Sequence, residues 1–217
     1  MLDFITINSL THATACVIWL HGLGADGHDF ESVVQALNLP HIQFVLPHAP
    51  YRKVTLNNGY EMRAWYDLYG LSKDSKQDEI GIHTSQAEIE AIIQQKISEG
   101  IPAERIAIAG FSQGGAIALQ TALRYPNKLA GVLALSTYLP ISTTLTTEKN
   151  SVNQNTPIFM AHGKFDDVIS IQTSQGSRDL LQTEHYQVEW HEYPMAHSVN
   201  LQEIEDIRTF LTRILPK

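Results

Sequence analysis

Six short apolar runs recur along the chain and constrain its fold more than any other feature. Each run is four to seven residues long, the length of a buried strand and far below the roughly 20 apolar residues that cross a bilayer. The runs cover residues 16–20, 42–46, 106–111, 129–135, 158–161 and 188–193. Continuous apolar strands are typical of sheets that are covered on both faces, so these runs predict a mostly parallel sheet.

Helical patterns separate many of these runs. One begins at a capping box formed by Ser85 and Glu88 and ends at Gly100. A second begins after Asn200 and ends at Pro216. Their apolar stripes are Ile89, Ile92, Ile93 and Ile97 in the first pattern and Ile204, Ile207, Leu211 and Ile214 in the second. Strands that alternate with helices predict an α/β fold with helices on both faces of the sheet.

The chain length favours one domain. With 217 residues, we expect a single α/β domain over residues 1–217. Two polar stretches, 72–79 and 142–156, are short enough to be surface loops between elements. No spare block of about sixty residues remains for a separate cap domain, so we expect an open site.

Charge and cysteine content limit the partners and the compartment. Fifteen basic and 23 acidic side chains give a net charge of −8, which repels nucleic acid and anionic lipid. Cys16 is the single cysteine, and the N-terminal segment lacks the basic residue and apolar stretch of a signal peptide. No metal-ligand spacing such as H-E-x-x-H occurs. We therefore expect a cytoplasmic protein without a metal site, a nucleic-acid partner or stable membrane insertion.

The run 106–111 leads into the motif Gly110-Phe-Ser112-Gln-Gly114 and then into a helix of small residues. The pattern G-x-S-x-G between a strand and a helix is typical of a nucleophile elbow, in which a serine lies on a sharp, strained turn. Cβ atoms at the two flanking positions would collide with the neighbouring strand and helix, so both positions need glycine. We predict that Ser112 is a nucleophile.

A serine hydroxyl is a weak nucleophile and needs a general base, which in turn needs a carboxylate to orient it. In folds with this elbow the chain order is serine, acid, histidine. Asp166 lies 54 residues after Ser112, and His197 lies 31 residues after Asp166, each just past a predicted strand. These residues complete a predicted triad. Asp167 remains an alternative acid, because sequence alone does not decide between neighbouring carboxylates.

Four other histidines compete for the role of base. His191 lies within an alternating strand pattern and His185 near a helix end. His21 and His162 each precede a glycine at a strand end, where histidine more often hydrogen-bonds a loop. We predict structural roles for these four and assign the base to His197.

An oxyanion hole needs two backbone N–H donors. One comes from the residue after the nucleophile, Gln113, and the other from a loop after an early strand, which residues 21–24 fit. The same loop begins a G-x-G-x-x-G pattern at Gly22, the fingerprint of dinucleotide-binding proteins. That function requires an acidic residue at the end of the next strand, where the chain reads Leu46-Pro47-His48-Ala49. An NAD-binding oxidoreductase is therefore a remote alternative.

Seven motifs together resemble the phospholipase/carboxylesterase family of α/β-hydrolases, which includes the acyl-protein thioesterases. The motifs are HGLGADGHDF, PHAP, MRAWYD, GFSQGGA, LSTYLP, HGKFDDV and YPMAHS. The resemblance implies an α/β-hydrolase fold without a lid, with Ser112 as nucleophile, His197 as base and Asp166 as its partner. It implies oxyanion donors at the amides of Leu23 and Gln113. It also implies an acyl-binding groove lined by Leu23, Leu68, Leu71, Tyr138, Val168 and Met195.

These observations predict a serine hydrolase that needs no cofactor. The expected substrates are carboxylic esters with short to medium acyl chains, cleaved through an acyl-enzyme. One alternative is an acyl-protein thioesterase or lysophospholipase that acts on long acyl chains. A remote alternative is a ligand-binding protein without turnover. An open apolar groove is compatible with a monomer or a weak homodimer that shields it.

Overall fold

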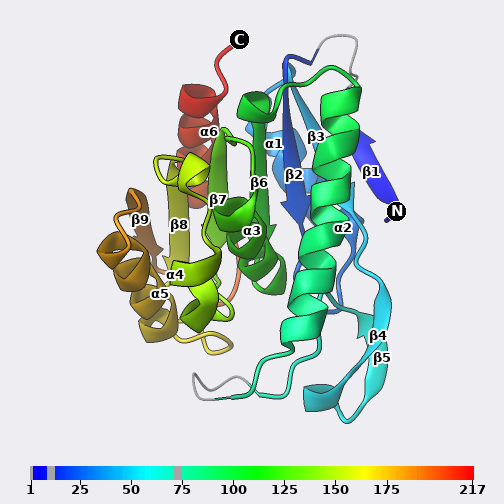
Figure 1. The fold of residues 1–217 in the computed structure, drawn as a ribbon, viewed down its shortest axis with the longest axis vertical. Coiled ribbons are helices and arrows are strands. Elements are labelled where there is room, and N and C mark those ends of the chain that lie inside the picture. The colour runs from blue at the N-terminus through cyan, green and yellow to red at the C-terminus, as the bar shows by residue number, and fades with distance from the viewer. Residues whose placement is uncertain (1, 9–12, 71–74) are drawn as a thin grey trace.

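A seven-stranded sheet forms the centre of the computed structural model, which describes residues 2–8, 13–70 and 75–217 (Figure 1). The strands are β1 (Phe4–Ile7), β2 (Ala15–Leu20), β3 (Ile42–Pro47), β6 (Ile106–Phe111), β7 (Gly131–Leu135), β8 (Ile158–Gly163) and β9 (Val188–Tyr193). Their order in the sheet is β1-β3-β2-β6-β7-β8-β9; β1 is antiparallel to β3, and the other pairs are parallel. The predicted α/β-hydrolase fold with a mostly parallel sheet is confirmed.

Each of the six apolar runs forms a strand of this sheet, although the run 129–135 enters its strand only at Gly131. β1 was not predicted, because it is a short edge strand whose residues are partly exposed and lack a continuous apolar pattern. A separate antiparallel hairpin, also not predicted, consists of β4 (Tyr51–Val54) and β5 (Tyr60–Arg63). Its strands alternate weakly and lie mostly at the surface.

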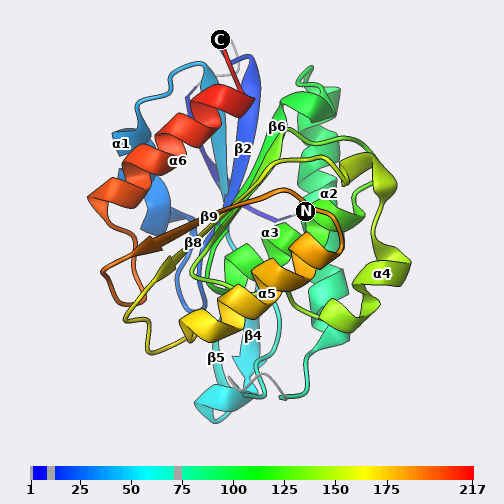
Figure 2. The same cartoon turned by 90° about the vertical axis from the view of Figure 1, so that its left-hand side faces the viewer.

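Helices cover both faces of the sheet. They are α1 (Glu31–Leu37), α2 (Glu79–Ser98), α3 (Gln113–Arg124), α4 (Leu145–Glu148), α5 (Ile171–Thr183) and α6 (Leu201–Ile214). Figure 2 shows α1 and α6 on one side of the strands and α2, α3 and α5 on the other. The short helix α4 lies within the stretch 142–156 that the sequence predicts as a loop. Within the described ranges, no helix has the length and apolarity needed to cross a bilayer.

Alternate residues of the central strands pack against opposite helix layers. In β2, Cys16 and Ile18 belong to the core beneath α2 and α3, whereas Val17 and Trp19 belong to the core beneath α1 and α6. All four side chains are at most 1% exposed. This period of two places both faces of the strand in apolar surroundings, which explains its continuous apolar sequence.

The two predicted helices differ in how well their starts could be recognised. α6 begins as predicted, because the Asn200 side chain accepts a hydrogen bond from the Glu203 N–H at 2.9 Å. The predicted start of α2 at Ser85 is wrong. Asp78 caps this helix by accepting from the Gly81 N–H at 3.0 Å, and Ser85, one and a half turns inside, donates its hydroxyl hydrogen bond to the Trp65 carbonyl.

The carboxyl ends of the central parallel strands meet at one edge of the sheet, the lower edge in Figure 1. Leu20 at the end of β2 is paired with Gly110 of β6, and Leu135 at the end of β7 is paired with Ala161 of β8. The segments that follow these strands are therefore neighbours in space. They carry the motifs at Gly22, Ser112 and Asp166.

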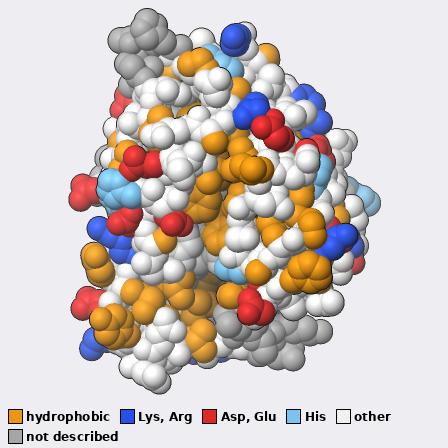
Figure 3. Space-filling model, turned by 180° about the vertical axis from the view of Figure 1, so that it is seen from behind, with side chains coloured by type: hydrophobic (Ala, Val, Ile, Leu, Met, Phe, Trp, Pro, Cys, Tyr) orange, Lys and Arg blue, Asp and Glu red, His pale blue; other side chains and the backbone are white. Residues whose placement is uncertain are grey.

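Hydrophobic side chains gather on the same end of the molecule. Seen from behind, they spread over the lower part of the surface and into a hollow (Figure 3). Tyr51, Leu56 and Tyr60, from the β4–β5 hairpin and its connection, are at least 40% exposed. The hairpin thus borders the edge at which the parallel strands end.

Candidate active site

Ser112 lies on a strained turn between β6 and α3. Its backbone angles are φ 53° and ψ −121°, a conformation that L residues rarely adopt. A Cβ at Gly110 would overlap the carbonyl of Gly114, and a Cβ at Gly114 would overlap the carbonyls of Leu20 and His21. Both glycines are therefore sterically required, as expected for an elbow.

Hydrogen bonds to the end of β7 and to the segment that follows it fix this turn. The Ser112 N–H donates to the Leu135 carbonyl at 2.9 Å. The Thr137 hydroxyl donates to the Ser112 carbonyl at 2.6 Å. Because β7 and the residues after it hold both sides of the turn, the strained serine cannot relax without disturbing them.

The structure brings His197 and Asp166 together. His197 follows β9, and its Nδ1 lies 2.7 Å from Asp166 Oδ2. The Asp166 carboxylate is fully buried, and its other oxygen accepts from the N–H groups of Val168 and Ile169 at 2.9 and 2.8 Å. Asp167 is exposed, and among the described residues it forms no ion pair with a histidine. The geometry therefore favours Asp166 as the partner of His197.

The His197 ring also contacts the turn that carries the serine. Its centroid lies 4.7 Å from that of Phe111, the residue before Ser112. Among the described residues, Ser112 and His197 form no direct hydrogen bond. Such serine–histidine bonds are often long in unliganded hydrolases and tighten when substrate binds.

A second histidine touches the same carboxylate. His162 Nε2 lies 3.2 Å from Asp166 Oδ2 and 2.8 Å from the Ile169 carbonyl. Burial lowers the pKa of His162, so its imidazole is neutral near pH 7. Because the Ile169 carbonyl can only accept a hydrogen bond, the proton is on Nε2. The predicted structural role of His162 thus extends to holding the turn that presents Asp166.

Two backbone amides beside Ser112 are free to bind an anion. Gln113 provides the first N–H of α3, and Leu23 lies on the loop after β2. A Cβ at Gly22 would lie 3.5 Å from the Ser112 Cβ, so this loop packs directly against the serine. Within the part of the chain that the structure describes, neither amide donates a hydrogen bond to the protein. This is the arrangement that an oxyanion hole requires.

His21 supports the loop that carries Leu23. Its Nε2 accepts from the Ala49 N–H at 3.0 Å, so Nδ1 carries the proton and donates to the Gly22 carbonyl at 2.7 Å. Burial lowers the pKa of His21 to about 4, so the ring is neutral near pH 7. The backbone carbonyl of His21 accepts from the Trp65 indole N–H at 2.8 Å. These contacts match the structural role predicted for His21.

The side chain of Gln113 has a second role that the sequence did not indicate. Its Oε1 accepts from the Trp65 N–H at 2.8 Å, and its Nε2 donates to the Tyr66 carbonyl at 2.7 Å. The amide therefore ties the start of α3 to the segment after β5. Asp67 anchors that segment further by accepting two hydrogen bonds from Thr55.

A cavity of about 360 Å³ lies beside this site. Its described walls come from the segments 66–70, 75–77 and 138–142, from Ile169 and from α5. Its described lining residues are Tyr66, Asp67, Leu68, Gly70, Ser75, Lys76, Gln77, Tyr138, Leu139, Ser142, Ile169, Gln172, Thr173, Gly176, Ser177 and Leu180. The sequence-derived groove residues Leu68 and Tyr138 are among them.

The other expected groove residues that the structure describes do not line this cavity. Val168 is 42% exposed, because its N–H is turned toward Asp166 and its side chain toward solvent. Met195 is 8% exposed and packs in the core beneath α1 and α6. Leu23 lies on the oxyanion loop and does not line the cavity. Leu71 lies outside the described residues.

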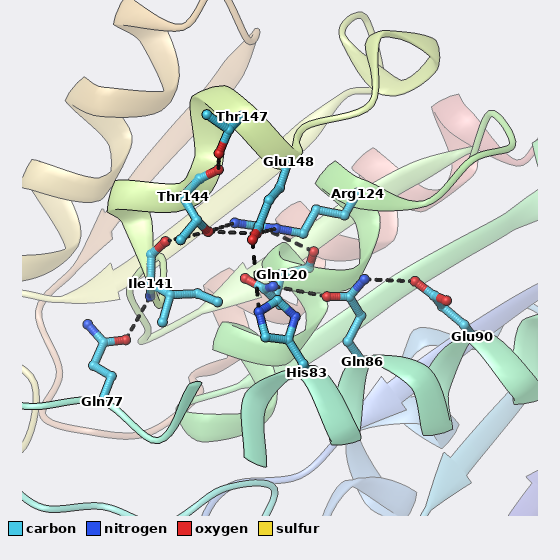
Figure 4. Close-up of polar contacts among 10 residues, drawn as sticks. All are labelled: Gln77, His83, Gln86, Glu90, Gln120, Arg124, Ile141, Thr144, Thr147 and Glu148. Atoms are coloured by element: carbon cyan, nitrogen blue, oxygen red, sulfur yellow. Dashed lines mark hydrogen bonds and ion pairs between the residues drawn. The ribbon is translucent and has the colours of Figure 1, made fainter. Parts of the chain in front are cut away.

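Side-chain hydrogen bonds hold the outer wall of the cavity (Figure 4). The Gln77 side-chain oxygen accepts from the Ile141 N–H at 2.7 Å and so joins the two wall segments. On the other side, Arg124 at the end of α3 donates to Glu148 at 2.7 Å and to Thr144 at 2.9 Å. The segment that contains α4 is thereby fixed between α3 and the residues that precede α2.

Proteins of known family match this chain over nearly its full length. Acyl-protein thioesterase 1 of Neurospora crassa is 43% identical over 223 residues, which covers 97% of this chain and 91% of that protein. Acyl-protein thioesterase 1 of Yarrowia lipolytica is 40% identical over 206 residues, 91% of each chain. The crystal structure of Zea mays acyl-protein thioesterase 2 matches with a TM-score of 0.89 at 28% identity, covering 99% of this chain and 100% of that one. The family model for phospholipase/carboxylesterase matches residues 3–215, and the chain belongs to this family of hydrolases.

Proposed function

We propose that this protein is a serine hydrolase that cleaves acyl thioesters and esters through an acyl-enzyme. The observation that carries the proposal is the 2.7 Å contact between His197 and the buried Asp166, next to a serine on a strained elbow. A binding protein without turnover needs neither the strain nor the oriented imidazole.

In the proposed mechanism, His197 Nε2 accepts the proton of the Ser112 hydroxyl as the oxygen attacks the acyl carbonyl carbon. The Asp166 carboxylate holds the proton on Nδ1 and stabilises the imidazolium that forms. The amides of Leu23 and Gln113 donate to the carbonyl oxygen as it becomes negative.

Collapse of the tetrahedral intermediate breaks the bond to the leaving group. The alcohol or thiol takes the proton from His197, and the acyl group remains on Ser112 as an ester. Water then attacks the acyl-enzyme, with His197 as base, and releases the carboxylic acid. The neutral His21 keeps the oxyanion loop in place throughout this cycle.

The similarity to acyl-protein thioesterases favours long-chain acyl thioesters over the short to medium esters that the sequence led us to expect. The cavity supports this choice. Its volume of about 360 Å³ falls within the range of small-molecule binding pockets, and Leu68, Leu139, Ile169 and Leu180 supply apolar surface. We infer that the acyl chain extends from Ser112 into this cavity.

The test is kcat/KM for p-nitrophenyl esters from acetate to palmitate and for the matching acyl thioesters, below their micelle-forming concentrations. We expect efficiency to rise with chain length, because each buried methylene contributes about 0.8 kcal/mol. Ser112→Ala should abolish turnover, whereas Ser98→Ala, on the exposed end of α2, should not. A maximum at acetate or butanoate would support the short-chain carboxylesterase instead. Absence of turnover with every substrate would support the ligand-binding alternative.

A further inference from the structure

Two tyrosines face each other in the wall of the cavity. The Tyr66 and Tyr138 hydroxyl oxygens are 2.9 Å apart, and both side chains line the cavity. Tyr66 is 1% exposed and Tyr138 is half-buried. Burial raises the pKa of both hydroxyls, so both are neutral and one donates to the other.

Backbone contacts tie the segments of both tyrosines to the turn that carries Ser112. The Tyr66 carbonyl accepts from the side chain of Gln113, the residue after Ser112. Tyr138 follows Thr137, whose hydroxyl donates to the Ser112 carbonyl at 2.6 Å. We therefore expect an acyl chain that leaves Ser112 for the interior of the cavity to pass these two rings.

A hydroxyl in the wall of an acyl pocket weakens the binding of an alkyl chain unless another protein group forms a hydrogen bond with it. An alkyl chain offers no hydrogen bond, so it must displace any water that a lone hydroxyl binds, which leaves a buried polar group without a partner. In this chain one hydroxyl donates to the other, so each has a hydrogen-bond partner. An alkyl chain that passes the two rings then meets neither hydroxyl without a partner.

We propose that the mutual hydrogen bond of Tyr66 and Tyr138 determines how well the protein accepts long acyl chains. The inference rests on the proposed function and assigns a specificity role to a pair of residues that do not take part in bond cleavage. A group that reaches only the oxyanion amides, such as acetyl, is insensitive to the pair. A chain long enough to pass the rings is sensitive to it.

The test compares Tyr66→Phe, Tyr138→Phe and the double variant. The quantity measured is the ratio of kcat/KM for p-nitrophenyl decanoate to that for p-nitrophenyl acetate. Each single variant should lower this ratio by about 5- to 100-fold, because it leaves one hydroxyl unpaired in the wall. The double variant should return the ratio to within about threefold of the original protein, because removal of both partners leaves no orphaned group.

Tyr186→Phe is the matched control. Tyr186 also carries a buried hydroxyl, which has no hydrogen-bond partner among the described residues, but it lies in a different hollow, beside β9 and α6. Its removal should leave the ratio unchanged. Thermal melting of all four variants separates a change in specificity from a loss of folded protein.

Single variants that leave the ratio unchanged would overturn the inference, and so would a double variant whose loss equals the product of the single losses. The acetate rate keeps this test distinct from that of the proposed function. If the original protein hydrolyses neither ester, the proposed function fails and the role of the pair fails with it. If it hydrolyses both and the ratios do not respond, only the role of the pair fails.

Discussion

The elbow around Ser112 and the wall of the neighbouring cavity are built in different ways. The elbow is held by strand ends, by two glycines that tolerate no Cβ, and by backbone hydrogen bonds to β7. The described wall consists of the segments 66–70, 75–77 and 138–142 with α5, joined by side chains that hydrogen-bond backbone groups of a distant segment. We therefore expect the chemistry of the proposed site to depend on the sheet and its substrate range to depend on side chains in connecting segments.

The largest expected effect is the loss of the proposed nucleophile. Ser112→Ala should lower kcat by about 10⁴- to 10⁶-fold, because only the oxyanion amides and substrate binding would remain. The unfolding temperature should change little, since the Ser112 side chain makes no hydrogen bond to the described protein. Steady-state kinetics and thermal melting check the two parts. An active variant would show that the elbow is not the reacting site.

The neighbouring carboxylates provide the next largest effect. Asp166→Asn should lower kcat by about 10³- to 10⁴-fold, because the amide no longer fixes the proton on His197 Nδ1. Asp167→Asn is the matched control and should change kcat by less than about threefold, because Asp167 is exposed. Equal losses in the two variants would contradict the assignment of the acid.

The same substitution, glycine to alanine, should change the stability of the protein in opposite directions in the two regions. Gly114→Ala should destabilise the protein by about 3 kcal/mol or more, because its Cβ would overlap the carbonyls of Leu20 and His21. Gly176→Ala in α5 should stabilise it by about 0.5–1 kcal/mol, because its Cβ meets no atom within 4 Å and alanine favours the helix. Denaturant unfolding measures both. If both substitutions changed the free energy of unfolding by a similar amount and in the same direction, the proposed difference between the two regions would be wrong.

Protonation of His21 at low pH should lower the free energy of unfolding of the protein. The pKa of His21 is about 4 in the folded protein and 6.5 ordinarily, so between these values the unfolded chain binds more protons. Stability is therefore lost as the pH falls from 6.5 to 4, by about 3 kcal/mol for this group. The free energy of unfolding of the original protein and of His21→Gln, measured from pH 7 to pH 4.5, isolates the contribution. If the free energy of unfolding depended on pH in the same way in both proteins, His21 would not contribute as predicted.

The smallest expected effect concerns the link across the cavity wall. Gln77→Leu removes the acceptor for the buried Ile141 N–H and should lower kcat/KM for decanoate by about three- to tenfold, with acetate unchanged. Gln77→Glu keeps an acceptor oxygen and should retain most of the efficiency. If the leucine variant lowers acetate and decanoate equally, the link supports the whole site and not the wall alone.

The fold was predictable because its strands are buried on both faces. Their apolar runs depend on local composition alone, and so do the G-x-S-x-G turn and the Asn200 cap of α6. The start of α2 was not predictable, because Ser85 forms its hydrogen bond with Trp65 in another part of the chain. Asp78 caps the helix in its place. Tertiary contacts therefore overrode a local signal.

The site was predictable only in part, for the same reason. The order of Ser112, Asp166 and His197 follows from strand ends, and the structure brings the last two together. The cavity arises from contacts between segments about 70 residues apart, such as the 2.9 Å contact between Tyr66 and Tyr138. No periodicity or motif encodes such a pairing, because it depends on how two loops meet in space.

The most direct test of the account is covalent labelling with a fluorophosphonate, followed by intact-mass measurement and peptide mapping. One adduct per chain is expected, on the peptide that contains Ser112, because among the described hydroxyls this one combines a strained turn with an adjacent imidazole and two free amides. The adduct should be absent from Ser112→Ala and should form much more slowly in Asp166→Asn. An adduct on a different serine, or none on folded protein, would contradict the account.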